Sequence, residues 1–166
     1  MADIARPWLG TFSALSAGDQ QVVAQLVVDG GALNATREQI AGRLARAYLL
    51  VLLREVGTDR IIAVGSLKSP DAGYRRRTFV EKARVAVDGF ERASELGYVV
   101  VAADMRGKRL SGLLVEHVVI ALEGPCYATT DDATMKKNLS RCGFAEVGQA
   151  WRGQRGMLSL WIFKVS

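Results

Sequence analysis

A chain of 166 residues that is 49% hydrophobic and 23% charged predicts one globular domain over residues 1–166, and its formal net charge of +5 suits a polyanionic partner, although such an excess is common among soluble proteins. Two cysteines outside any CxxC motif and a single histidine exclude a disulfide scaffold and a Cys/His zinc cluster, so no metal site is expected. No apolar run reaches the ~20 residues of a membrane-spanning helix and residues 1–7 lack signal-peptide organisation, so we expect a cytoplasmic protein without a membrane partner.

Two helices are predicted near the N-terminus. Ser16 is a suitable N-cap for the first helix, which the two glycines at residues 30–31 would end. Thr36 and Gln39 have the spacing of a capping box at the start of the second helix.

Strands follow these helices. The apolar runs 48–55 and 60–67 predict two strands, and residues 57–59 between them predict a hairpin turn. Residues 68–73 are an expected loop, and the apolar spacing over residues 78–87 predicts a helix.

The second half of the chain predicts a buried strand, a helix and two further strands. Residues 95–98 lead into the β-branched run 99–101, which is typical of a buried central strand. Apolar residues at helical spacing over 110–122 predict a helix, and residues 144–151 and 156–164 predict a final pair of strands. The sequence therefore predicts a mixed α/β domain with helices over both faces of one sheet.

The turn between the central strand and the following helix contains Arg106, Gly107 and Lys108. The first N–H groups of a helix have no partner within the helix, and the helix dipole adds partial positive charge at that end. A strand, a basic turn with a glycine and a helix N-terminus therefore predict an anion site, for which a pyrophosphate is the natural ligand.

Residues 99–114 resemble motif A of the GNAT superfamily of N-acetyltransferases, whose pattern after the strand is Q/R-x-x-G-x-G/A. Arg106 matches the first position, whereas Arg109 stands where the middle glycine is usual and Ser111 where the last glycine or alanine is usual. Residues 127–144, which end in a Gly-Phe pair, look like the fifth strand and fourth helix of the same family.

The resemblance implies a GNAT-like α/β fold, in which a central mixed, mostly antiparallel sheet carries helices on both faces. It also implies that acetyl-CoA is the co-substrate and that its acetyl group passes directly to a primary amine in a ternary complex. A homodimer would be in keeping with the family. The acceptor amine is not specified by these residues.

In the family, the motif A loop binds the pyrophosphate of acetyl-CoA. The resemblance places this role on the backbone amides of residues 107–112, with added charge from Arg106 and Lys108 and a hydroxyl group from Ser111. Because a side chain disfavours positive φ, Arg109 is expected to avoid the left-handed conformation that a glycine would adopt.

The pantetheine arm of acetyl-CoA would bind the backbone of residues 99–101. Asp132 stands where many members of the family have an asparagine that binds the same arm. The expected cofactor-binding residues are Val99, Val100, Val101, Arg106, Gly107, Lys108, Arg109, Leu110, Ser111, Gly112 and Asp132.

Acetyl transfer needs a base, because the attacking amine must be neutral. Glu95 is the candidate, since it precedes the central strand where histone-acetylating members of the family carry a catalytic glutamate. A carboxyl group in a partly apolar cleft would have a raised pKa and would deprotonate the amine through water. The alternative is that Glu95 only caps a loop entering the strand.

The departing thiolate needs a proton. Leu139 stands where the family has the tyrosine that supplies it, and leucine cannot donate a proton. Tyr127, in the expected fifth strand, is the candidate substitute, with Ser140, Cys142 or water as others. Tyr127 would equally serve as a packed core tyrosine.

Two other functions stay open on the sequence. The missing family tyrosine is compatible with a regulatory module that binds CoA without turnover. The basic run at residues 74–77 would suit a nucleic-acid-modifying protein of the same fold, although a solvated helix start explains a lone basic triplet as well.

Overall fold

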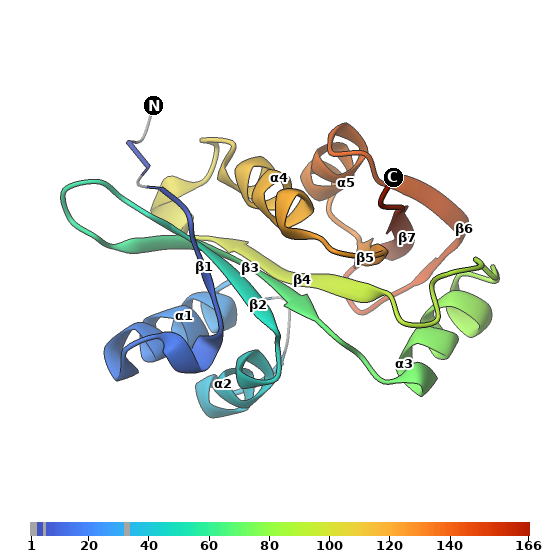
Figure 1. Cartoon of the computed structure of the whole chain (residues 1–166), viewed down its shortest axis with the longest axis horizontal. Coiled ribbons are helices and arrows are strands. Elements are labelled where there is room, and N and C mark those ends of the chain that lie inside the picture. The colour runs from blue at the N-terminus through green and yellow to red at the C-terminus, as the bar shows by residue number, and fades with distance from the viewer. Residues whose placement is uncertain (1–2, 5, 32–33) are drawn as a thin grey trace.

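The computed structural model describes residues 3–4, 6–31 and 34–166, which form a seven-stranded sheet in the order β1-β2-β3-β4-β5-β7-β6 (Figure 1). Its strands are β1 (Trp8–Gly10), β2 (Leu49–Arg54), β3 (Ile61–Lys68), β4 (Ser94–Val101), β5 (Cys126–Thr130), β6 (Ala145–Arg152) and β7 (Met157–Phe163). The pair β4 and β5 is parallel, and the other neighbouring pairs are antiparallel. The mixed, mostly antiparallel sheet is therefore confirmed.

Helices cover both faces of this sheet, as predicted. They are α1 (Ala17–Asp29), α2 (Arg37–Ala45), α3 (Ala72–Arg76), α4 (Leu110–Ala121) and α5 (Ala133–Arg141), with the 3-10 turns η1 (Phe12–Ala14) and η3 (Ala103–Met105) and the π-helical turn η2 (Arg77–Lys82). α1 and α2 lie on one face, and α4 and α5 on the other (Figure 1). Alternate β2 side chains serve the two cores: Leu50 and Leu52 pack with α1 and α2, whereas Val51 and Leu53 pack with α4.

A third apolar cluster lies under η2. Phe79 contacts the rings of Phe90 and Tyr127, with ring centroids 6.0 and 5.1 Å apart. Leu160 and Ile162 of β7 complete the cluster from the sheet. This packing places α3 and η2 beside the start of β4.

The two N-terminal helices begin where their caps predict. The Ser16 hydroxyl accepts a hydrogen bond from the N–H of Asp19 at 3.1 Å. The capping box is complete, because the N–H of Gln39 donates to the Thr36 hydroxyl at 3.2 Å and the N–H of Thr36 donates back to the Gln39 side chain at 2.9 Å. Local side-chain chemistry therefore fixes both starts.

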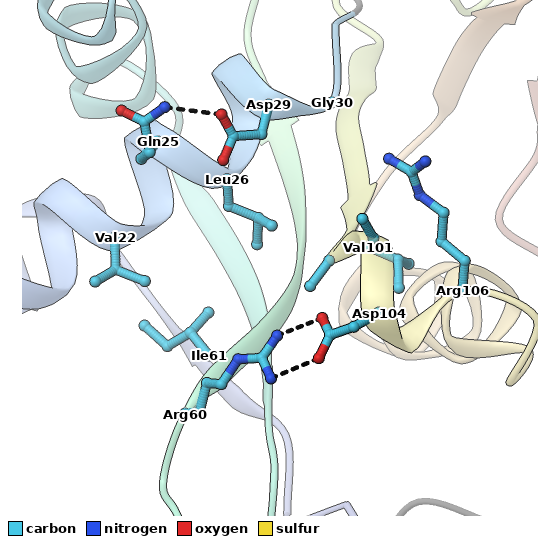
Figure 2. Close-up of a pocket in the computed structure, with 12 residues that line it drawn as sticks. Val22, Gln25, Leu26, Asp29, Gly30, Arg60, Ile61, Val101, Asp104 and Arg106 are labelled. Atoms are coloured by element: carbon cyan, nitrogen blue, oxygen red, sulfur yellow. Dashed lines mark hydrogen bonds and ion pairs between the residues drawn. The ribbon is translucent and has the colours of Figure 1, made fainter.

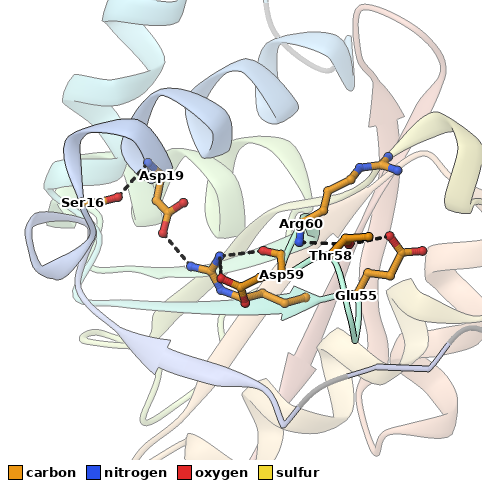
Figure 3. A network of polar contacts seen from close by, with 7 residues as sticks. Ser16, Asp19, Glu55, Thr58, Asp59 and Arg60 are labelled. Atoms are coloured by element: carbon orange, nitrogen blue, oxygen red, sulfur yellow. Dashed lines mark hydrogen bonds and ion pairs between the residues drawn. The ribbon is translucent and has the colours of Figure 1, made fainter.

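Arg54 of β2 joins α1 to the β2–β3 hairpin. Its guanidinium donates to the Asp19 carboxylate at 2.7 Å and to the carbonyl oxygen of Asp59 at 3.0 Å. Figure 3 shows Asp19 between its cap partner Ser16 and the turn at Asp59. Because Arg54 is mostly buried, the network holds the start of α1 over the sheet.

The position of the helix predicted at residues 78–87 is wrong. The helix begins six residues earlier, at Ala72, because Asp71 caps it by accepting a hydrogen bond from the N–H of Tyr74 at 2.8 Å. It continues as the π-helical turn η2 and ends at Lys82.

A tertiary hydrogen bond ends this helix early. The carbonyl oxygen of Ala83 accepts a bond from the N–H of Gln149 in β6 at 2.8 Å, in place of a helical partner. Arg84 is left-handed, with φ of 55°, and Ala86 is exposed rather than buried. Because Ala83 and Gln149 are far apart in the chain, no local sequence pattern predicts the hydrogen bond that ends the helix.

The described ranges contain no helix with both the length and the apolarity needed to cross a bilayer. Within the same ranges, no three His, Cys, Asp or Glu side chains are grouped to hold a metal ion. Cys126 and Cys142 are free thiols, and burial raises the pKa of Cys126 to about 12.

Candidate active site

β4 and β5 are paired only where they begin. Ser94 lies opposite Cys126 and Glu95 opposite Tyr127, and no later pair of described residues joins the two strands. The other edge of β4 is bonded to β3, so among the described residues the edge that faces β5 has no ladder partner from Gly97 onward. A ligand that runs along this edge would find unpaired hydrogen-bonding groups.

The three valines expected to bind pantetheine lie on this edge. Val100 is buried in the cluster under α1 and α2, whereas Val99 and Val101 pack against the cluster under α4. Their side chains are therefore part of the core, and their backbone is what a ligand can reach.

A bulge interrupts β4 between Gly97 and Val100, a short way beyond Glu95. The register with β3 shifts between Val64 and Ser66, and the Ser66 hydroxyl donates to the carbonyl oxygen of Gly97 at 2.7 Å. Tyr98 has a φ of 49°, a conformation that costs a residue with a side chain about 1 to 3 kcal/mol. Backbone strain of this kind is concentrated at functional sites. No sequence pattern predicted the conformation of Tyr98.

Glu95 is a strand residue and is only 6% exposed, so the alternative, in which it only caps a loop entering the strand, is wrong. The Lys68 ammonium lies 3.6 Å from one of its carboxylate oxygens, and the Tyr74 hydroxyl donates to the other at 3.4 Å. Burial raises the pKa of the Glu95 carboxyl, and the charge of Lys68 opposes this shift. The expected raised pKa is confirmed.

The sequence did not place Lys68 or Tyr74 beside Glu95. Lys68 ends β3, where it pairs with Glu95, and its ammonium lies 4.5 Å from the ring centroid of Tyr98. Tyr74 comes from α3, and burial raises its pKa to about 12, with the Glu95 charge contributing. Lys68 reaches Glu95 through the strand register, and Tyr74 lies in a helix that the sequence predicted to begin later, so neither contact could be predicted.

Tyr127 lies on the same face of the sheet as its register partner Glu95. It is fully buried in the cluster under η2, and its hydroxyl has no hydrogen-bond partner among the described residues. Burial raises the pKa of this phenol far above its ordinary value. These surroundings match the packed core tyrosine of the sequence analysis, and Leu139 is likewise fully buried.

The expected anion loop has the geometry of a helix entry, with one correction. Gly107 has a φ of 80°, and Arg109, the residue before α4, has a φ of 63° and a ψ of 22°. The prediction that Arg109 avoids the left-handed conformation is therefore wrong. The chain must turn at this position to enter α4 at Leu110, so Arg109 accepts a cost of about 1 to 2 kcal/mol.

The first turn of α4 is held by α5. The amide of Asn138 donates to the Ser111 hydroxyl at 2.9 Å, and Arg141 donates to the Asn138 oxygen at 3.2 Å. A Cβ atom at Gly112 would collide with the Arg141 guanidinium. Ser111 keeps its own proton to donate to an anion, and the Arg141 cation lies beside the helix N-terminus.

Asp132, the other expected pantetheine residue, is exposed and caps α5. Its carboxylate accepts a hydrogen bond from the N–H of Met135 at 2.7 Å. One carboxylate oxygen is thus engaged locally. Its neighbour Asp131 lies 3.7 Å from Arg155 in the β6–β7 turn, and Arg155 also donates to the carbonyl oxygen of Gly31 at 3.4 Å.

A pocket of about 380 Å³ lies between α1, the start of β3 and the end of β4 (Figure 2). Arg106 lines it, and its guanidinium extends away from the exposed ion pair between Arg60 and Asp104. Val101 at its edge is six residues from Glu95, or roughly 20 Å along the strand. The pocket therefore adjoins the anion loop rather than Glu95.

The basic run at residues 74–77 is largely bonded to the protein itself. Arg75 donates to the carbonyl oxygens of Ala93 and Glu91 at 2.9 and 3.0 Å, and Arg76 lies 3.1 Å from the Glu81 carboxylate. These bonds anchor α3 to the segment that leads into β4, which fits the helix interpretation better than a nucleic-acid surface.

A comparison with protein-family models gave no match, and neither did a comparison with curated proteins. Solved structures do match. A GNAT family acetyltransferase from Streptococcus agalactiae is 11% identical with a TM-score of 0.72, covering 100% of this chain and 99% of that one. An acyl-CoA N-acyltransferase from Pseudomonas aeruginosa is 16% identical with a TM-score of 0.66, covering 98% and 99%. Arabidopsis thaliana NAA60 in complex with acetyl-CoA is 12% identical with a TM-score of 0.66, covering 96% and 100%.

These likenesses extend over nearly the whole chain and so include the sheet and the helices on both of its faces. The chain has the fold of the GNAT acetyltransferases.

Proposed function

We propose that this protein is a cytoplasmic acyltransferase that moves the acetyl group of acetyl-CoA directly to a primary amine. The observation that carries the proposal is the divergence of β4 from β5 directly after the buried Glu95, along an edge that leads to the glycine-containing loop before α4. A base, a strand edge for the arm and an anion site then lie along one line.

The anion loop would hold the pyrophosphate. Backbone amides of residues 107–112 lie at the N-terminus of α4, and Arg106, Lys108 and Arg109 add positive charge. The Ser111 hydroxyl, oriented by Asn138, would donate to a phosphate oxygen. The free edge of β4 would bond the pantetheine arm through the backbone of residues 99–101.

Glu95 would act as the general base. Its raised pKa brings its basicity closer to that needed near neutral pH, and the carboxylate would take a proton from the incoming amine directly or through water. Two donors are proposed for the thiolate that leaves: the Tyr127 hydroxyl, which lies on the same face as Glu95, and a water. The variant Tyr127→Phe separates them.

Calorimetric titration with acetyl-CoA tests the cofactor site. We expect micromolar binding by the wild type and its loss in Ser111→Asp, because the new carboxylate would repel the pyrophosphate. An aspartate in the first turn of α4 favours the helix dipole, so this loss would not reflect unfolding. Ser140→Asp, on the exposed side of α5, is the matched control. Equal binding by all three proteins would refute the site.

A second candidate is a CoA-binding regulatory module without turnover. It is favoured by the full burial of Leu139, which leaves no side-chain proton donor at the family's usual place. Tight CoA binding with no acylation of any amine in a panel of polyamines, amino acids and peptides would select this function over the first.

A further inference from the structure

The Lys68 side chain places a primary amine beside the proposed base. Its ammonium nitrogen lies 3.6 Å from a Glu95 carboxylate oxygen and 4.5 Å from the centroid of the Tyr98 ring. These contacts make a carboxylate and an aromatic face converge on one amine. An acceptor amine in the proposed reaction needs such a base. An aromatic face also attracts the ammonium form before it loses its proton.

The same side chain lies across the β4 bulge. A Cβ atom built on Gly97 would come within 2.7 Å of the Lys68 Cε and 2.9 Å of its Nζ. Gly97 is two residues beyond the last pair that joins β4 to β5, so the amine lies where the free strand edge begins. An arm bound along that edge from the anion loop would end at this point.

Lys68 can also be reached from solvent, because its side chain is 25% exposed whereas Glu95 is 8% exposed at its side chain. Its stem is held by packing and its cation by two partners, so little side-chain entropy would be lost on reaction. Lys137, on the exposed side of α5, has no carboxylate within ion-pair distance among the described residues.

We propose that Lys68 is itself an acyl acceptor, so that the protein acylates its own Lys68 side chain from acetyl-CoA. The inference rests on the proposed function. The Lys68 ammonium gives a proton to Glu95, and the nitrogen lone pair attacks the thioester carbon. The C–N bond forms, the C–S bond breaks, and the nitrogen loses a second proton, which the departing thiolate of CoA takes up. The product is an amide at Nζ, with no change in oxidation state.

Acylation would act back on Glu95. It removes the positive charge that lies 3.6 Å from the carboxylate and the cation over the Tyr98 ring. Because that charge lowers the pKa of Glu95, its loss would raise the pKa further. The modified protein would therefore need a higher pH to keep Glu95 ionised, and its turnover of free amines at neutral pH would fall.

Peptide mapping by mass spectrometry tests the proposal on the full chain. After incubation with acetyl-CoA, we expect acetylation at Lys68 at a rate about tenfold or more above that at Lys137, and independent of protein concentration. Glu95→Gln and Ser111→Asp should each reduce the Lys68 rate towards the Lys137 rate. Lys68→Arg should remove the modified peptide.

Three results would overturn the inference. Equal rates at Lys68 and Lys137, unchanged when the protein is denatured in urea, would show spontaneous acylation. Turnover of free amines with Lys68 unmodified would refute self-acylation and leave the proposed function standing. Failure to bind acetyl-CoA would refute both. The pH profile of Lys68→Gln provides a second readout, because loss of the charge should shift the acidic limb, which reports ionisation of Glu95, to higher pH.

Discussion

The Glu95 carboxyl sits between one cation and one phenol, yet burial still governs its proton affinity. Its folded pKa lies above its ordinary value of 4.5, so the folded state holds this proton more tightly than the unfolded state does. The contribution to stability is fully present below that value and is lost as the pH rises through the folded pKa.

The variant Glu95→Gln should therefore show two opposite effects. Its unfolding free energy, followed by urea titration across the pH range, should decline less than that of the wild type as the pH rises above 4.5. Its kcat/KM should fall roughly 100-fold or more and lose the limb that reports the base. An unchanged pH–rate profile would remove Glu95 from the chemistry.

Arg109 carries backbone strain in the anion loop, with φ at 63°. Arg109→Gly should raise the unfolding free energy by roughly 1 kcal/mol, because glycine adopts this conformation without the steric cost. Arg109→Ala keeps the strain and removes the charge, so it is the matched control. Thermal unfolding should separate the two variants, and both should bind acetyl-CoA with a weaker dependence on salt than the wild type.

Tyr127 has a fully buried hydroxyl without a partner in the described chain. Tyr127→Phe keeps the contact with Phe79 and removes the unsatisfied group, so stability should rise by about 1 kcal/mol in denaturant unfolding. A loss of kcat of about 100-fold in the same variant would assign the thiolate's proton to Tyr127, and an unchanged kcat would assign it to water.

At the scale of elements, the docking of α5 on α4 sets the position of the anion loop. Asn138 is 7% exposed and bonds both Ser111 and Arg141. Asn138→Ala should cost roughly 2 kcal/mol, because two hydrogen bonds are lost in a buried site. The KM for acetyl-CoA should rise while kcat changes little. Ser140→Ala, on the exposed side of the same helix, should change neither quantity.

Element boundaries could be predicted where one local contact decides them. Ser16 and Thr36 cap their helices through residues three positions away, and the hairpin strands follow from apolar runs on either side of a turn. The bounds predicted for the helix at 78–87 were wrong at both ends. Its start depends on the Asp71 cap, which stands before the predicted range, and its end depends on the distant N–H of Gln149.

At the scale of the whole molecule, the resemblance in the second half of the chain predicted the sheet, its helices and the strand–loop–helix site. The environment of Glu95 could not be predicted, since Lys68 and Tyr74 reach it only through strand register and the packing of α3. The conformation of Arg109 was predicted wrongly, because the propensity of one residue was weighed without the turn that the following helix imposes.

Because β4 and β5 are paired over so short a length, the sheet without a bound ligand resembles two smaller sheets joined at one place. One contains β1 to β4 and the other contains β5, β7 and β6 (Figure 1). Among the described residues, only the pairs at Ser94 and Glu95 join the two. A ligand seated on the open edges would act as the missing strand and make the sheet continuous. Amide hydrogen exchange should then slow along both edges at once, so that binding stiffens the molecule across its middle.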